Sequence, residues 1–76
     1  MRTAPRLDST NLSPRETEVL CLMATSATYR EIAEQLLIAE STVHTYVRRI
    51  LKKLLSTNRT QAVMKALELG IIERSG

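Results

Sequence analysis

Three segments of this chain begin with the same helix-start signal. Ser13 is followed three residues later by Glu16, Thr28 by Glu31, and Asn58 by Gln61. At this spacing the first side chain accepts a hydrogen bond from a free backbone N–H of the first turn, and the second reaches back to the cap. No segment shows the apolar–polar alternation of a strand, so the sequence predicts an all-α fold.

Apolar residues at helical spacing extend these starts into four predicted helices. They are expected at 14–25, 29–37, about 40–55, and 59 to about 69, where Gly70 would close the last one. Ala39 is a poor cap, so the first turn of the third helix should fray. In the first helix Leu20, Met23 and Ala24 are expected to face inward, flanked by Val19; the third helix has one continuous apolar face, made of Val43, Val47, Ile50, Leu51 and Leu54.

Positive charge is concentrated in one part of the chain. The segment 41–65 contains six Lys or Arg residues and no Asp or Glu, whereas the remainder holds five basic and eight acidic residues. This asymmetry favours a face that binds a polyanion, although a solvated basic helix face would give the same pattern. Two Tyr and no Phe or Trp provide too few stacking platforms for single strands, so double-stranded DNA is the expected partner.

Several other functions are excluded by the residues that the chain lacks. One cysteine permits no internal disulfide or cysteine metal cluster, and two glycines form no phosphate-binding loop. His44 has no partners for metal binding or general-base catalysis. We therefore expect no enzyme activity, no metal and no cofactor. The longest apolar run, 19–24, is too short to span a membrane, and a single Cys21, expected to be partly buried, fits a reducing cytoplasm.

The connection between the second and third predicted helices is only about three residues long, 37–39. A short helix joined so tightly to a long amphipathic one is typical of a helix-turn-helix motif, whose second helix lies in the major groove of DNA. The polar face of that helix carries side chains that can donate hydrogen bonds to bases and phosphates: Ser41, His44, Thr45, Arg48, Arg49 and Lys52.

At this point four blocks of the chain resemble the C-terminal DNA-binding domain of the LuxR/NarL/GerE family. They are LSPRETEVLCLMA, YREIAEQL, IAESTVHTYVRRILKKL and NRTQAVMKALELGII. The resemblance spans 12–72 and implies a four-helix bundle in which the second and third helices read DNA and the fourth forms a dimer contact. Residues 1–11 are then expected to be a disordered arm or linker remnant, and 73–76 a tail. Such domains occur as effector domains of response regulators and as stand-alone regulators.

The resemblance and the helix-turn-helix geometry together assign the site residues. Three outward positions in the first half of the third helix are expected to contact base edges: His44, Thr45 and Arg48. Phosphate contacts are expected from six further residues: Thr28, Arg30, Thr42, Tyr46, Arg49 and Lys52. The family usually has Lys and His where this chain has His44 and Tyr46, so its target sequence is not carried over.

Two positions depart from the family in the backbone they require. Ser26 and Leu55 stand where the family usually has Gly. We expect a different or slightly strained turn at Ser26, and a third helix that ends one or two residues later to avoid a left-handed leucine. For Arg59 two roles remain open: an ion pair with Glu16 or Glu31, or a phosphate contact.

The fourth predicted helix has a second apolar side, formed by Thr60, Met64 and Leu67. We expect it to form a homodimer on a roughly palindromic site, unless Leu67 folds back onto the core and Met64 is a lone exposed residue. The predicted function is a sequence-specific DNA-binding transcription regulator. The alternative is an interaction module that uses the same basic face on the transcription machinery, with RNA polymerase as a candidate partner.

Overall fold

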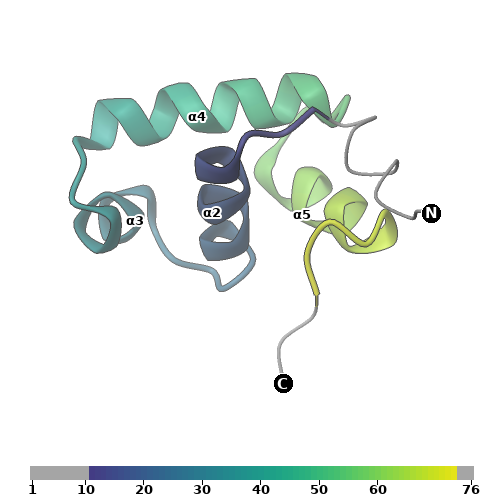
Figure 1. Ribbon diagram of the computed structural model, residues 1–76, viewed down its shortest axis with the longest axis horizontal. Helices are drawn as coiled ribbons and strands as arrows, with labels where there is room; N and C mark the ends of the chain where they lie inside the picture. The colour runs from purple at the N-terminus through teal and green to yellow at the C-terminus, as the bar shows by residue number, and fades with distance from the viewer. Residues whose placement is uncertain (1–10, 74–76) are drawn as a thin grey trace.

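The computed structural model describes residues 11–73, and within that range it contains four helices and no strand (Figure 1). The helices are α2 (Pro14–Met23), α3 (Tyr29–Leu36), α4 (Glu40–Lys53) and α5 (Arg59–Glu68). The all-α prediction is confirmed, and each helix begins at its predicted residue, although α2 and α4 each end about two residues earlier than expected. Nearly all of the predicted arm, 1–10, and the end of the tail, 74–76, lie outside the described residues.

Two of the three helix-start signals form complete capping boxes. At α2, Ser13 Oγ accepts from the Glu16 N–H at 3.1 Å, and Glu16 Oε1 accepts from the Ser13 N–H at 2.9 Å. Thr28 and Glu31 exchange the same pair of bonds at the start of α3, at 3.0 and 2.8 Å. Each pair satisfies two backbone donors that the first turn would otherwise leave free.

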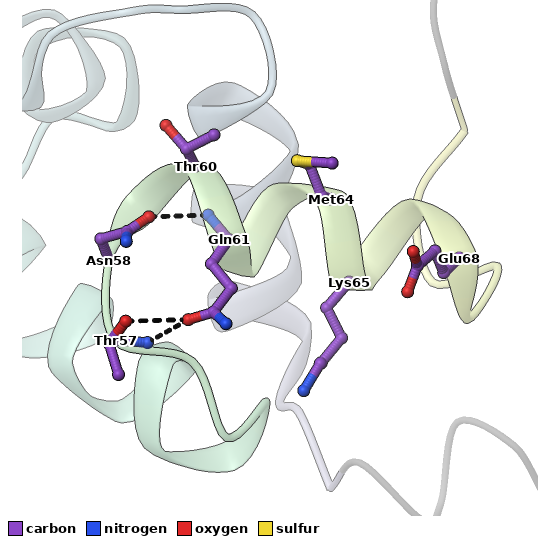
Figure 2. A pocket seen from close by; sticks show the side chains of 7 residues that line it. All are labelled: Thr57, Asn58, Thr60, Gln61, Met64, Lys65 and Glu68. Atoms are coloured by element: carbon purple, nitrogen blue, oxygen red, sulfur yellow. Dashed lines mark hydrogen bonds between the residues drawn. The ribbon is translucent and has the colours of Figure 1, made fainter.

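The third signal works only in part. Asn58 Oδ1 accepts from the Gln61 N–H at 2.8 Å, as a cap should. The Gln61 side chain, however, accepts from the backbone N–H and the hydroxyl of Thr57 instead of reaching Asn58 (Figure 2). Ala39 caps α4 without any side-chain hydrogen bond, as predicted.

The core is formed where α4 crosses the other helices. Helix α4 contacts α2, α3 and α5 (Figure 1). Its buried residues are the predicted Val43, Val47 and Ile50, and Leu54 is buried at the end of the helix. The predictions for α2 were wrong at Ala24 and Cys21, both of which are exposed. These two residues are three positions apart and share the outward side of α2, while Val19, Leu20 and Met23 take up the inward side.

Three helices end with the same left-handed closure, and only one of them uses glycine. After α5, Gly70 has the predicted left-handed conformation, with φ 75°, and the Ile71 N–H donates to Ala66 O at 2.9 Å. Leu37 (φ 58°) and Leu55 (φ 53°) take the glycine position after α3 and α4.

The expectation that α4 would end late to avoid a left-handed leucine was therefore wrong. The Ser56 N–H donates to Leu51 O at 2.8 Å and the Leu55 N–H to Lys52 O at 3.2 Å, which satisfies two end carbonyls and offsets the strain. Ser26 is also left-handed, at φ 70°, so the strained turn expected there is confirmed.

Leu55→Gly is expected to stabilise the domain. A left-handed leucine costs about 1–2 kcal/mol, and glycine removes this strain. Glycine also has greater freedom in the unfolded chain, which reduces the gain in stability by about 0.5–1 kcal/mol. Leu55 is 82% exposed, so little burial is lost. Urea denaturation should show a gain of about 0.5–1 kcal/mol. Leu55→Ala, which keeps the strained backbone, is the control and should stay close to the wild type. An equal gain in both variants would show that the exposed side chain, and not the backbone, is the cause.

Candidate nucleic-acid interface

The connection between α3 and α4 consists of residues 37–39, as the helix-turn-helix prediction required. Figure 1 shows α4 along one side of the molecule, with the other three helices beneath it. Because the apolar stripe of α4 is turned toward those helices, its polar face is left open to solvent. Among the described residues, no helix is long and apolar enough to cross a membrane.

The three predicted base-contacting residues lie on the open part of α4. His44 and Arg48 are exposed, and Thr45 is partly buried. The Thr45 hydroxyl donates to Ser41 O at 3.2 Å, so its proton is already used within the helix. Within residues 11–73, the Arg48 guanidinium makes no hydrogen bond or ion pair. Arg48 therefore keeps all its donors for a ligand.

The four predicted phosphate contacts on α4 divide into two groups. Arg49 and Lys52 are exposed, and neither forms an ion pair with a carboxylate of the described residues. Thr42 and Tyr46 are partly buried, and the Tyr46 ring packs against the core. The cations of this face that form no ion pair with a described carboxylate are therefore Arg48, Arg49 and Lys52.

The two predicted phosphate contacts on and before α3 are engaged elsewhere in the structure. Thr28 uses its hydroxyl oxygen to cap α3. Arg30 lies 3.5 Å from Glu34 in an exposed pair one turn apart. Exposed pairs of this kind contribute about 0.2–1 kcal/mol, so a phosphate can displace Glu34 at little cost.

His44 belongs to a cluster that the sequence reasoning missed. Its Nε2 lies 3.4 Å from Glu40 Oε2, and its ring meets the Tyr29 ring edge-on at a centroid distance of 4.9 Å. Arg59 places its guanidinium 5.2 Å from the centroid of Tyr29 and donates to Met23 O at 2.9 Å. The spacing of Glu40 and His44, one helical turn, was the available signal.

The structure places Arg59 differently from the ion pair considered for it. Its guanidinium contacts an aromatic ring and a backbone carbonyl, and it pairs with neither Glu16 nor Glu31. Arg59 thus joins the start of α5 to the end of α2 and the start of α3. This role needs a planar cation with several donors, which lysine does not provide.

A second missed feature is a buried ion pair between α2 and α4. Glu16, 3% exposed, accepts from Lys53 Nζ at 2.8 Å, and Lys53 also donates to Asn11 O at 2.9 Å. Burial raises the pKa of the Glu16 carboxyl. Hydrogen bonds from Lys53 and from the Ser13 N–H lower this pKa, as do the positive charges of Lys53 and Arg49, and together they outweigh the effect of burial. The net pKa is lowered, and Glu16 is therefore charged at neutral pH.

The predicted dimer side of α5 is only partly exposed. Met64 is 57% exposed and Thr60 is exposed, but Leu67 packs against the core. Figure 2 shows Thr60 and Met64 on the same side of α5, and both residues line a hollow together with Lys65 and Glu68. The exposed apolar area on this side therefore comes chiefly from Met64.

Within residues 11–73, no three His, Cys, Asp or Glu side chains are placed to hold a metal ion.

The chain is similar to known proteins over most of its length. Residues 10–66 match the family described as bacterial regulatory proteins, luxR family. A family of regulators is in line with the prediction that the chain is not an enzyme.

Several curated relatives are similar over most of this chain. Over 84% of it, the chain is 45% identical to the transcriptional activator protein SolR of Ralstonia nicotianae. It is 49% identical over 78% of its length to an uncharacterized transcriptional regulatory protein, YxjL, of Bacillus subtilis. Identity to the transcriptional activator protein CarR of Pectobacterium carotovorum is 45% over 79% of the chain. The matched region spans 27%, 27% and 25% of these relatives. The chain belongs to the LuxR family of bacterial regulatory proteins.

Proposed function

We propose that this domain binds double-stranded DNA with α4 in the major groove, and that the protein containing it regulates transcription. The observation that carries the proposal is the open face of α4, where Arg48, Arg49 and Lys52 have no carboxylate partners among the described residues. Three cations on one helix face attract phosphates, and an arginine near the middle of the helix, Arg48, can reach base edges. The names of the relatives, transcriptional activators and regulators, support the same function.

The proposed division between base contacts and phosphate contacts along α4 follows the family resemblance. His44, Thr45 and Arg48 would contact bases, whereas Arg49 and Lys52, together with Thr42 and Tyr46, would contact phosphates. Arg30 and Thr28 would add contacts from α3 to the backbone of the DNA. Phosphate contacts set the position of the helix on the duplex and carry no sequence information themselves, so the base contacts decide the target.

Neutralising Arg49 or Lys52 should weaken binding to every duplex by the same factor. Each phosphate contact releases a condensed counterion, so Arg49→Gln or Lys52→Gln should reduce the slope of log K against log salt by about one. Binding to random-sequence duplex is measured by titration at several salt concentrations. Arg15→Gln is the matched control, because Arg15 pairs with Glu18 on α2 and its loss should leave the slope unchanged. Unchanged slopes in both test variants would contradict the assignment. No binding of the wild type to any duplex at low salt would favour the interaction-module alternative.

We also propose that two copies bind a roughly palindromic site through Thr60, Met64 and Leu67 of α5. A two-fold contact places a surface against itself, and we place Met64, the most exposed apolar residue of this side, at the axis, where it would meet Met64 of the second copy. The exposed apolar area is small, and the dimer is therefore expected to form mainly on DNA, where neighbouring half-sites raise the effective concentration.

Met64→Glu and Met64→Lys should each abolish cooperative binding to a duplex with two half-sites. A mixture of the two variants should restore it, because opposite charges then meet across the two-fold axis. Leu67 is left intact in this test, since it packs against the core. Occupancy of both half-sites is measured by gel shift at rising protein concentration. Unchanged cooperativity in each single variant would exclude α5 as the dimer surface.

A further inference from the structure

The ring of His44 is held from two directions in the first half of α4. Glu40 lies one turn before it, with Oε2 3.4 Å from His44 Nε2. Tyr29 of α3 meets the ring at an interplanar angle of 87°. Tyr29 itself lies against Arg59, whose guanidinium is anchored on Met23 O at 2.9 Å. The imidazole is therefore constrained by a carboxylate on its own helix and by an aromatic ring on α3.

This arrangement favours one of the two ring nitrogens as the position of the proton. An ionised carboxylate can only accept hydrogen bonds, so Nε2 must be protonated to bond with Glu40. A neutral imidazole has one proton, and Nδ1 is then an acceptor. Nδ1 makes no hydrogen bond with any residue of 11–73. The His44 side chain is 47% exposed, which leaves it accessible to a ligand.

We propose that Glu40 is a positioning residue that decides which base His44 reads. This inference rests on the proposed function, in which His44 faces base edges. With Nε2 committed to Glu40, Nδ1 accepts a hydrogen bond from an exocyclic amino group. In the major groove adenine N6 and cytosine N4 are the amino donors, whereas guanine and thymine present carbonyl acceptors. Without Glu40, either nitrogen could carry the proton, and this preference would weaken.

The proposal separates the tasks of two neighbouring residues on α4. Arg48 has donors only and therefore suits guanine O6 and N7. His44, held by Glu40, contributes an acceptor one turn away. The lysine that the family usually has at position 44 would offer hydrogen-bond donors only. His44 offers an acceptor instead, so this chain should select a different base at this position from the one that a lysine would select. Glu40 itself repels phosphates, and its presence beside the groove costs affinity.

The test selects binding sites from a pool of randomised duplexes at pH 8.5, where imidazoles are neutral. It compares the wild type with His44→Ala, Glu40→Ala and a control, Glu18→Ala. The control removes an exposed carboxylate from α2, far along the chain from α4 and paired with Arg15. Preferences at each position are then confirmed by titration with single-base variants of the selected duplex.

The expected result concerns one base position of each half-site. The wild type should favour adenine or cytosine over guanine there by about twofold to tenfold, the range for one neutral hydrogen bond. His44→Ala and Glu40→Ala should both lose this preference, while Glu18→Ala keeps it. Glu40→Ala should also bind random duplex more tightly than the wild type, a gain that damage to the fold would not produce.

Other outcomes overturn the inference, and they differ from failure of the proposed function. A wild type that selects guanine at the His44-dependent position, or a Glu40→Ala protein with unchanged preference, contradicts the role of Glu40 while leaving DNA binding intact. A preference that His44→Ala does not alter also contradicts it. A pool in which the wild type enriches no sequence overturns both the inference and sequence-specific binding.

A spectroscopic measurement tests the same point without DNA. His44 is the only histidine of the chain, so its ring signals need no assignment. Long-range ¹H–¹⁵N correlations at pH 8.5 should show the proton on Nε2 in the wild type and a mixture of tautomers in Glu40→Ala. A wild type with the proton on Nδ1 would overturn the proposal.

Discussion

Glu16→Gln is expected to reduce the free energy of unfolding by about 2–3 kcal/mol at pH 7. The substitution removes the charge that Lys53 Nζ contacts at 2.8 Å and leaves the lysine without its buried partner. Lys53 is 30% exposed and can regain some water, which keeps the loss below the about 3–5 kcal/mol typical of fully buried pairs. A domain of this size has a total stability of about 4–11 kcal/mol, so the loss is a large fraction.

The pH dependence of this loss has a definite sign. The pKa of Glu16 is lowered in the folded state, so the pair stabilises the fold above the unfolded carboxyl pKa of about 4.3. That contribution disappears as the pH falls through the lowered pKa. Urea denaturation should therefore show a wide gap in the free energy of unfolding between the wild type and Glu16→Gln at pH 7, and this gap should narrow as the pH falls through the lowered pKa of Glu16.

Glu18→Gln is the matched control for this experiment. It removes the same charge from α2, but its partner Arg15 is exposed and the pair contributes little. Its stability should stay within about 0.5 kcal/mol of the wild type. Equal losses in the two variants would show that the charge of α2, and not the contact with Lys53, stabilises the domain. Lys53→Met tests the pair from the other side and should cost a comparable amount.

The parts of this fold that the sequence predicted are those that depend on near neighbours. Ser13 and Thr28 start helices through residues three positions away, and the connection 37–39 is fixed by where two helices end and begin. The apolar face of α4 could also be predicted from the sequence, because its buried positions recur with the helical period. In each case the signal and its structural consequence lie within a few residues of each other.

Apart from the local contact of His44 with Glu40, the missed features depend on contacts between distant segments or on competing energies. Glu16 and Lys53 are 37 residues apart, and nothing near either residue indicates the other. Tyr29 reaches His44 only because α3 packs on α4. The end of α4 was predicted too late because the prediction considered only the strain of a left-handed Leu55. It did not include the two hydrogen bonds that compensate for this strain.

Arg48→Ala is expected to remove most of the sequence preference of the domain and to leave binding to random duplex only modestly weaker. Arg48 has no partner among the described residues, and it is the strongest donor that the open face of α4 offers to a base edge. A bidentate contact to guanine O6 and N7 gives about 1–3 kcal/mol of discrimination, or about fivefold to 150-fold in affinity. The measurement compares binding to a selected duplex and to random duplex at fixed salt.

Arg49→Ala is the matched control for Arg48→Ala. The two variants lose the same side chain at neighbouring positions of one helix, so charge and helix propensity are matched. Arg49→Ala should weaken binding to selected and random duplex by the same factor and leave their ratio unchanged. Arg48→Ala should instead bring that ratio down by the factor of the lost contact. If Arg48→Ala kept the full ratio, the base reading would lie elsewhere on α4, and His44 and Thr45 would be the residues left to provide it.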